Sequence, residues 1–377
     1  MRRTRQWSIV AGAVALVVAT AGPALAQEAP VATTLPVAPP TTVAPASAVP
    51  AAPAAPTATT LAPTTTVPAP APEAAVPGAG APEVVVPTNQ PTDSRPVTGD
   101  FDGTGRSTVF WYSKSSVDRR WHGKTDRTFA EMEPEVAGGD YRPFTGDFNG
   151  DRFADIFFWG PGPAADALWY GKADGTYTKV AAPSALDYVT PLPGDFNGDG
   201  RTDIVWYKPG HTVMWRSVRN PQGQDTFDVT PMQVTNTYTP FVGDFNGDRR
   251  ADIFWFRGGT ASDQIWYGKP DYSFDRTTRA VDGHYDAALA GDYDGNGRTD
   301  ILWYKAGTGQ DYVWWSAAGT TFTSAKITVN GTYKPFVGDF DGDRRADVFW
   351  WGPGNSPDVT WFGKANRQFA PGPAVRA

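Results

Sequence analysis

Short apolar runs, each preceded by a polar turn, recur along the chain from about residue 95 onward. Four consecutive apolar residues stand at 156–159, 253–256 and 348–351. Unbroken runs of this length are typical of strands that are buried on both faces of a sheet. No stretch has a convincing 3.6-residue period of apolar positions. The pattern therefore predicts an all-β fold.

The polar turns are near-copies of one another at a nearly constant spacing. Each follows a glycine, in steps of 47, 48, 49, 48 and 47 residues: Gly99, Gly146, Gly194, Gly243, Gly291 and Gly338. Each repeat predicts four strands: one that ends at this glycine, the apolar run, a third strand that carries a tryptophan, and a less regular fourth strand. A period of this size indicates a propeller or a solenoid.

Closure into a ring accounts for both ends of the repeat array. The strand expected at 95–100 has no earlier blade to join, and no seventh copy follows the strand near Phe369. A ring would join these ends and leave no open sheet edge, whereas a solenoid would need polar caps, and none is visible. Loop position six also alternates between glycine and arginine, which indicates three pairs of blades. We therefore expect a six-bladed β-propeller, with seven blades as the alternative.

The turn that begins at Asp195 has the composition of a loop that binds a divalent cation. With this aspartate as position one, side-chain oxygens at positions one, three, five and nine and the backbone carbonyl at position seven can converge on one ion. Gly198 at position four permits the left-handed backbone of a sharp turn. An EF-hand would need glutamate at position twelve, but Trp206 stands there. Calcium fits better than magnesium, which demands compact octahedral geometry and keeps several waters.

Five of the six copies contain the full set of predicted ligands. The predicted calcium ligands are Asp147, Asn149, Asp151, Phe153 and Asp155; Asp195, Asn197, Asp199, Arg201 and Asp203; Asp244, Asn246, Asp248, Arg250 and Asp252; Asp292, Asp294, Asn296, Arg298 and Asp300; and Asp339, Asp341, Asp343, Arg345 and Asp347. The first copy keeps Asp100 and Asp102 but has threonine at positions five and nine, so its site is expected to be weak or empty. Ordinary polar turns do not need the aspartate that recurs at position nine.

The six in-phase copies resemble the FG-GAP or VCBS repeats, a family best known from the integrin α-chain propeller and from many secreted bacterial proteins. The resemblance covers Pro96 to the C-terminus. It implies a calcium-binding β-propeller and is nearly silent on what the propeller binds. Some members of the family carry catalytic domains, and no such domain is recognised in this sequence.

The N-terminal residues predict export followed by a spacer. Arg2, Arg3 and Arg5 precede an apolar segment that ends in small residues, which predicts a signal peptide over residues 1–26. A retained membrane anchor is the alternative, but the apolar run is shorter than the roughly 20 residues that a span needs. Residues 27–94 are almost entirely proline, alanine, threonine and valine, which predicts a disordered linker. The propeller is expected over residues 95–377.

Charge and cysteine content agree with calcium as the stabilising element. The chain has no cysteine, so disulfides cannot stabilise an exported fold. Loss of the three N-terminal arginines would take the formal net charge from −7 to −10, and five divalent ions would bring it back to about zero. A chain with a pI near 5.0 repels phosphate, so nucleic acid is not an expected partner. No membrane span is expected in the mature form.

The residue types favour a binding module over an enzyme. The three histidines occupy unrelated repeat positions, and no Gly-x-Ser-x-Gly elbow is present. Glu131, Glu133 and Glu135 are expected to cluster in one variable loop. We therefore expect a secreted, non-catalytic module that binds an extracellular protein or adheres at the cell surface. A carbohydrate-binding propeller is the second hypothesis, and a polysaccharide-active enzyme is the third.

Aromatic residues bear on the choice between protein and glycan ligands. Of the fifteen tryptophans, all but Trp7 fall in the predicted second or third strands. Such regular placement favours a role in the core, since blades need bulky residues between them. Tyr170, Tyr267 and Phe362, each next to a third-strand tryptophan, are the candidates for a glycan-binding groove. Exposure of these side chains would favour the carbohydrate hypothesis.

Overall fold

The computed structural model describes residues 94–375, except 161–164, 186–189, 260–261, 308 and 353–357. The predicted signal peptide, and all of the predicted linker except Ser94, lie outside the described residues. Every regular element in the described part of the chain is a strand, so the predicted all-β fold is confirmed. Accordingly, the described residues contain no helix with the length and apolar character needed to cross a membrane.

The strands of the described residues form six antiparallel sheets of four strands each, which we call blades 1 to 6. Blades 1 to 3 consist of β1 (Arg95–Gly99), β2 (Thr108–Tyr112), β3 (Asp118–Gly123) and β4 (Phe129–Glu135); β5 (Arg142–Gly146), β6 (Asp155–Trp159), β7 (Ala167–Gly171) and β8 (Tyr177–Ala181); and β9 (Thr190–Gly194), β10 (Asp203–Tyr207), β11 (Thr212–Arg219) and β12 (Asp225–Met232). Blades 4 to 6 consist of β13 (Thr239–Gly243), β14 (Asp252–Phe256), β15 (Asp263–Gly268) and β16 (Phe274–Arg279); β17 (Ala287–Gly291), β18 (Asp300–Tyr304), β19 (Asp311–Ala317) and β20 (Thr321–Ile327); and β21 (Lys334–Gly338), β22 (Asp347–Trp351), β23 (Asp358–Lys364) and β24 (Gln368–Val375).

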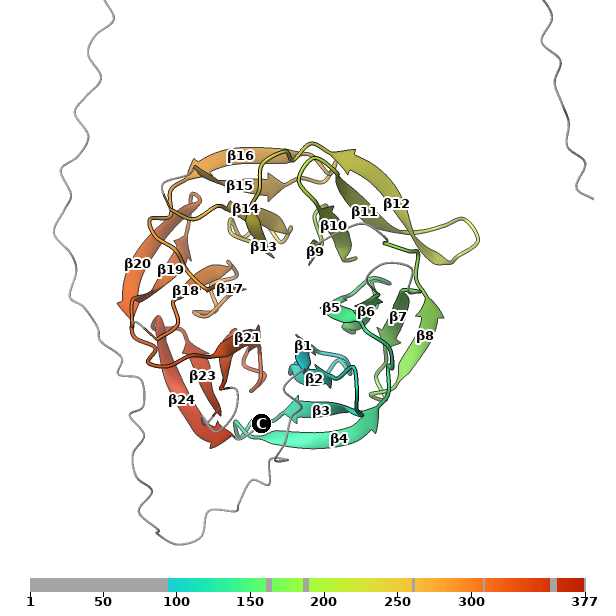
Figure 1. The fold of residues 1–377 in the computed structure, drawn as a ribbon, viewed down its shortest axis with the longest axis horizontal. Coiled ribbons are helices and arrows are strands. Elements are labelled where there is room, and N and C mark those ends of the chain that lie inside the picture. The colour runs from blue at the N-terminus through green and yellow to red at the C-terminus, as the bar shows by residue number, and fades with distance from the viewer. Residues whose placement is uncertain are drawn as a thin grey trace, which may run out of the picture. The chain divides into compact units, whose positions relative to one another are not determined.

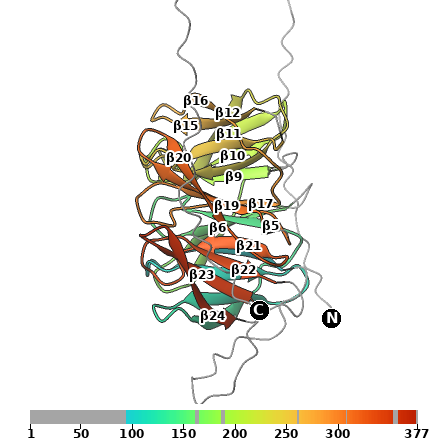
Figure 2. The same ribbon diagram turned by 90° about the vertical axis from the view of Figure 1, so that its left-hand side faces the viewer.

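Strands pair in chain order within every blade, because short turns can join antiparallel neighbours. The first strand of each blade lies nearest the centre of the ring and the fourth lies at its rim (Figure 1). Figure 2 shows the same blades from the edge of the ring. One sequence repeat therefore corresponds to one blade, and the prediction of four strands per repeat is confirmed.

The second strand of each blade is the most deeply buried element. All five of its residues are buried in every blade. Neighbouring blades cover both faces of the sheet at this point, so alternation between polar and apolar residues would place polar groups in the core. This explains why the sequence shows unbroken apolar runs there.

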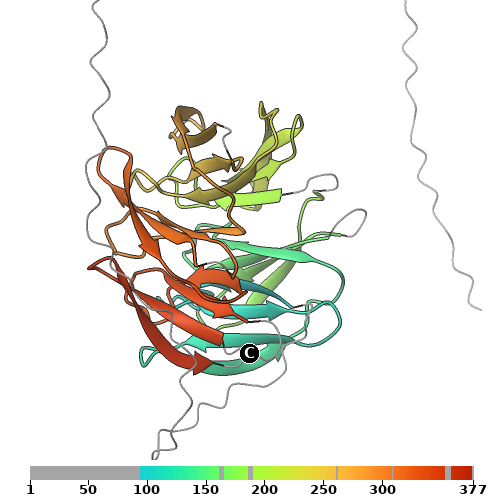
Figure 3. The same cartoon turned by 60° about the vertical axis from the view of Figure 1, so that its left-hand side comes forward.

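Hydrogen bonds join each blade to the next and the last blade to the first. At every interface the backbone N–H of loop position eight donates to the carbonyl of position one in the preceding blade, over 2.6 to 2.8 Å. The ring closes when Ser107 N donates to Asp339 O at 2.6 Å and Thr98 Oγ1 donates to Val337 O at 2.6 Å. Figure 3 shows the red C-terminal blade beside the cyan N-terminal blade. Six blades complete the circle, so the seven-bladed alternative is wrong.

The core is divided into six apolar clusters, one at each interface between blades. Thirteen of the fourteen tryptophans in the strands are buried, and many aromatic pairs meet edge to face, as Trp111 and Trp121 do at 5.0 Å. Such contacts are favourable for aromatic rings. The expectation that regularly placed aromatics form the core is confirmed, with Trp314 as the single half-buried exception.

Two kinds of interface alternate around the ring. Where an odd-numbered blade meets the next blade, a tyrosine hydroxyl at the end of the second strand makes two backbone bonds. Tyr304 Oη donates to Gly331 O and accepts from Tyr333 N, both at 2.9 Å, and Tyr112 and Tyr207 make equivalent bonds. At the other three interfaces a hydroxyl at loop position eight accepts from the position-one N–H: Ser107, Thr202 and Thr299. This agrees with the three pairs of blades that the sequence indicates.

Candidate functional site

The predicted metal loops connect the first and second strands of each blade. In copies two to six, the carboxylate at position one accepts hydrogen bonds from the backbone N–H groups of positions four, five and six. For Asp195 these donors are Gly198, Asp199 and Gly200, at 2.7, 3.1 and 2.8 Å. N–H groups that point at one anion form a concave anion-binding loop. The loop backbone therefore holds the first predicted ligand in place.

Two residues in each loop have a left-handed backbone. At position four φ is +82° at Gly198, as predicted, and a Cβ on the equivalent Gly150 would also lie 3.0 Å from Cγ of Arg201 in the next blade. Position six is left-handed as well, with φ of +86° at Gly200. In the even-numbered copies an arginine holds this conformation, as Arg249 does at +67°. A Cβ makes such a backbone costly.

The aspartate at position nine opens the second strand and is fully buried in copies two to six. Its two oxygens accept hydrogen bonds from different parts of the blade. Oδ2 of Asp252 accepts from Phe245 N at 2.8 Å within the loop, and Oδ1 accepts from Gly268 N at 2.9 Å on β15. The same two bonds recur in the other four copies. Position nine thus ties each loop to the third strand.

Burial makes the negative charge at position nine costly. It raises the pKa of Asp155 and Asp347 to about 8 and that of Asp203, Asp252 and Asp300 to about 7, although backbone hydrogen bonds oppose the shift. Repulsion from the other carboxylates of the same loop raises these pKa values further. Among the described residues none of the five forms an ion pair with lysine or arginine. A divalent cation would stabilise the ionised form of such a cluster.

Carboxylates converge most closely in copies five and six. In each of these loops three oxygens, one from each residue, lie within 4.8 Å of one another: Asp292, Asp294 and Asp300, and Asp339, Asp341 and Asp347. In copies two to four position three is asparagine, and its amide nitrogen donates to position five, as Asn246 does to Asp248 at 2.9 Å. The position-five side chain accepts from the backbone N–H of position seven in all five loops, so it braces the turn. The ligand role of the position-seven carbonyl stays a prediction.

The metal loops and the buried second strands fall within segments that match a known sequence repeat. The FG-GAP-like repeat pattern matches residues 147–206, 195–255, 244–303 and 292–350, which together span more than half of the chain. This chain belongs to the FG-GAP-like repeat family. Each match begins at position one of a metal loop and ends in the second strand of the next blade. The FG-GAP-like unit therefore includes the contact between two blades.

The FG-GAP-like chain has no match among curated proteins. Solved structures that resemble it include a fungal lectin from Aleuria aurantia, described as a six-bladed β-propeller that recognises fucose, at 11% identity and a TM-score of 0.48 over 77% of this chain and 98% of that chain. AofleA from Arthrobotrys oligospora is 10% identical, with a TM-score of 0.46 over 76% and 87%. Rhamnogalacturonan lyase PL11 from Bacillus licheniformis is 14% identical, with a TM-score of 0.31 over 76% and 68%. Likenesses this distant carry no argument about function.

The first FG-GAP-like loop differs from the others at its base. Thr108 is buried at position nine, and its hydroxyl lies 2.9 Å from Nδ1 of His122 on β3. Asp102 Oδ2 lies 3.6 Å from the same nitrogen, and Arg106 Nε donates to Nε2 at 3.3 Å. A catalytic relay needs the hydroxyl and the carboxylate on opposite imidazole nitrogens, so this cluster is not one. Burial lowers the pKa of His122.

A second set of buried aspartates is absent from the predicted site residues. They stand three residues before the third-strand tryptophan in five blades: Asp118, Asp166, Asp263, Asp311 and Asp358. Asp263 accepts from Arg257 N at 2.8 Å and from Val281 N at 2.9 Å, and the first, second and fourth members make equivalent pairs of bonds. They join the turn before the third strand to the loop after the fourth. Their constant spacing from the third-strand tryptophan could have identified these aspartates from the sequence.

The aromatic side chains predicted for a glycan-binding groove lie mostly in the core. Tyr267 and Phe362 are buried, and only Tyr170 is half-buried. Trp314 occupies the same repeat position as five buried tryptophans, yet it is only half-buried. The residues proposed for the groove are therefore the wrong ones in two of three positions.

The expected glutamate loop is a strand. Glu131, Glu133 and Glu135 lie on β4, at the rim of blade 1. Glu131 pairs with Arg119 at 3.1 Å, and Glu135 pairs with Lys179 at 3.0 Å. The expectation of a variable loop is wrong, because alternate residues of this edge strand face solvent and tolerate charge. Two of the three carboxylates are therefore engaged in ion pairs on the rim of the blade.

Proposed function

We propose that this protein is a secreted, calcium-stabilised propeller that acts as a non-catalytic binding module outside the cell or at its surface. One observation carries the proposal: in five loops a fully buried aspartate lies beside the carboxylates of its own turn. Extracellular modules typically bind calcium at about 10⁻⁴ to 10⁻³ M. The signal peptide expected at residues 1–26 supports export into a calcium-rich medium.

The favoured partner is an extracellular protein, bound in adhesion. A ring of six blades presents many loops on a rigid scaffold, and loops on such scaffolds commonly carry binding residues. The ion-paired glutamates of β4 and the His122 cluster support a non-catalytic role. Glycan binding is the second candidate, and one observation favours it: Trp314 is only half-buried, whereas the equivalent tryptophans are buried.

Calcium binding is tested by calorimetry on the full chain. We expect about five equivalents of calcium, with magnesium a poor competitor because it needs compact octahedral geometry. The double variant Asp248→Thr/Asp252→Thr gives loop four the threonines that loop one has at positions five and nine, and it should remove one equivalent. Asp271→Asn, in an exposed turn of the same blade, is the matched control and should remove none. No calcium uptake by the wild-type chain would contradict the proposal.

Binding is tested with labelled full-length protein on cell surfaces and on immobilised matrix proteins. We expect attachment in calcium that is lost in EDTA, because chelation loosens the loops. Protease treatment of the surface should abolish attachment to a protein partner, whereas periodate treatment should abolish attachment to a glycan. Attachment that persists in EDTA, or hydrolysis of a polysaccharide by the purified chain, would argue against a calcium-stabilised, non-catalytic module.

A further inference from the structure

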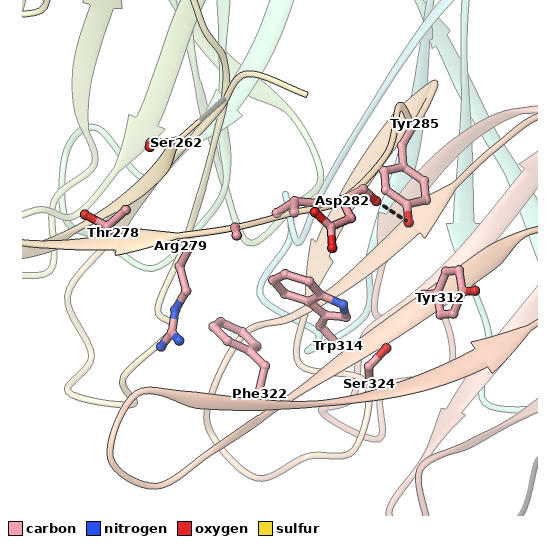
Figure 4. Close-up of a pocket in the computed structure, with 11 residues that line it drawn as sticks. Ser262, Thr278, Arg279, Asp282, Tyr285, Tyr312, Trp314, Phe322 and Ser324 are labelled. Carbon is pink, nitrogen blue, oxygen red and sulfur yellow. Dashed lines mark hydrogen bonds between the residues drawn. The ribbon is translucent and has the colours of Figure 1, made fainter. Parts of the chain in front are cut away.

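A cavity of about 750 Å³ lies between blades 4 and 5, on the outer part of the ring. Its walls come from the end of β16 and the loop after it, and from β19 and β20 of the next blade. Figure 4 shows Trp314 in the middle of the labelled residues that line it. The volume falls in the range of small-molecule binding sites.

The residue opposite Trp314 on the neighbouring strand is small. In blade 2 the partner of the third-strand tryptophan is Lys179, whose Nζ lies 3.7 Å from the ring centre of Trp169. In blade 4 Arg276 covers Trp266 in the same way at 3.8 Å. The partner of Trp314 is Ser324, which is too short to cover the indole. Blade 5 therefore lacks the cationic cover that blades 2 and 4 place over the equivalent indole ring.

The aromatic platform is held rigidly. Trp303, which is fully buried, meets Trp314 edge to face at 5.4 Å, and Phe322 packs against it at 5.6 Å. The face of an indole ring carries partial negative charge and attracts the weakly positive C–H groups of a sugar ring. A platform that is already fixed loses little entropy when a ligand stacks on it.

Polar groups surround the platform. Nε of Arg279 is buried without a hydrogen-bond partner among the described residues, while its terminal nitrogen donates to Thr320 O. This nitrogen is enclosed by protein, so the cavity is lined by the other atoms of Arg279. Asp282 and the hydroxyl of Tyr312 add acceptors and a donor at the cavity wall. Asp263, which accepts from Val281 N at 2.9 Å, anchors the loop that carries Asp282.

We propose that this cavity binds a neutral saccharide unit, which stacks on Trp314 and hydrogen-bonds to Arg279 and Asp282. The inference rests on the proposed function as a binding module and names a ligand class for it. A ligand with one apolar face and several hydroxyl groups matches a lining of this kind. The cavity walls carry one cation and one carboxylate, which balance each other and favour an uncharged ring over a phosphate or a uronic acid.

The test uses the full chain in calcium. A glycan array with neutral and acidic oligosaccharides identifies binders, and the methyl glycosides of hexoses, deoxyhexoses and N-acetylhexosamines are then titrated by calorimetry. Ser324→Arg places over Trp314 the cover that Arg276 gives Trp266. Ala325→Arg, the next residue on β20, adds the same charge on the other face of the strand and is the matched control. Asp282→Ala, in an exposed loop, is a second variant.

We expect the wild-type chain and Ala325→Arg to bind a neutral saccharide with one site. Ser324→Arg and Asp282→Ala should each weaken that binding by about tenfold or more, with the number of calcium equivalents unchanged. Failure of every neutral saccharide to bind, equal binding by Ser324→Arg and Ala325→Arg, or binding of acidic saccharides only would overturn the inference. If calcium uptake occurs while no saccharide binds, only the cavity assignment fails, and the calcium-stabilised module stands.

Discussion

At position six of the metal loops, glycine and arginine hold the same backbone conformation in alternate blades. φ is +79° at Gly297 and +67° at Arg344. The N–H of this residue donates to the position-one carboxylate in both cases, at 2.7 and 2.8 Å. The hydrogen bond therefore fixes the left-handed backbone whatever the side chain. An L side chain makes that backbone costly, so the arginines are strained and the glycines are not.

Relief of this strain gives a prediction at the residue scale. Arg249→Gly should raise the free energy of unfolding by about 0.5 to 1 kcal/mol, because the left-handed penalty of an L residue exceeds the extra chain entropy of glycine. The reverse change, Gly200→Arg, should lower it by a similar amount, since a Cβ there meets no atom within 4 Å and only the backbone matters. Urea denaturation in calcium measures both. Equal stability of the two variants would refute the argument.

The buried aspartates that stand three residues before the third-strand tryptophans give a prediction on pH. Burial raises the pKa of Asp166 above its ordinary value of 3.8, although the N–H groups of Ala185 and Gly160 oppose the shift. The folded state therefore holds this proton more tightly than the unfolded state. The stability that the protonated carboxyl of Asp166 contributes is fully present below pH 3.8 and is lost as pH rises through the raised pKa.

A variant without this carboxyl separates its titration from that of the metal loops. The unfolding free energy of the wild-type chain, minus that of Asp166→Asn, should fall as pH rises above 3.8 toward the raised pKa of Asp166. The loops titrate equally in both proteins, so their contribution cancels. Urea denaturation at several pH values in calcium measures the difference. A difference that rises with pH would show that the carboxyl is stabilised in its charged form.

At the scale of the element, side-chain hydrogen bonds join each blade to the next. The side chain that makes these bonds alternates from one interface to the next around the ring. The odd blades use a tyrosine at the end of the second strand, and the other interfaces use a serine or threonine at loop position eight. The even blades also stack two phenylalanines from their first and second strands, as Phe241 and Phe254 do at 4.9 Å. Two blades thus form the structural unit that repeats three times.

Removal of one tyrosine hydroxyl tests the contribution of these hydrogen bonds between blades. Tyr304→Phe should lower the free energy of unfolding by about 1 to 3 kcal/mol, because the N–H of Tyr333 loses its acceptor, while the carbonyl of Gly331 keeps only its bond from Gly307 N. Tyr285→Phe is the control, since its hydroxyl makes a single exposed bond of 3.4 Å, and it should change stability by less than about 0.5 kcal/mol. Thermal and urea unfolding in calcium measure both. Similar effects of the two variants would contradict this contribution.

At the scale of the whole molecule, the ring is a chain of equivalent interfaces with no disulfide to hold it. The backbone N–H of loop position eight donates to the carbonyl of position one in the loop of the preceding blade. The metal loops therefore form part of every interface between blades. Disorder in one loop therefore weakens two neighbouring blades. This couples the proposed calcium sites to the closure of the ring.

Calcium removal should consequently destabilise the entire propeller. At 1 mM free calcium and a dissociation constant of about 10⁻⁴ M, each site would add about 1.4 kcal/mol, or about 7 kcal/mol for five sites. We expect EDTA to lower the melting temperature and to speed proteolysis, and magnesium to restore less than calcium does. Calorimetric scans and limited proteolysis measure these effects. Identical melting temperatures in EDTA and in calcium would refute the prediction.

The sequence alone determined the all-β class, the four strands of each repeat and the need for glycine at loop position four, and it favoured six blades over seven. It could do so because these features depend on local pattern: burial on two faces removes alternation, and a left-handed turn favours glycine, as at Gly198. The nearly constant spacing of the repeats indicated the number of blades, because a closed ring needs a whole number of equal blades.

Only the tertiary structure decided which side chains are exposed to solvent and which are hydrogen-bonded to distant parts of the chain. Trp314 occupies the same repeat position as five buried tryptophans, yet it is half-buried and faces the small side chain of Ser324 on the adjacent strand β20. The role of Asp263 likewise appears only when β15 and the loop after β16 are placed together. Contacts between residues distant in the chain leave no periodic trace in the sequence, because each depends on the size of one partner brought close by the fold.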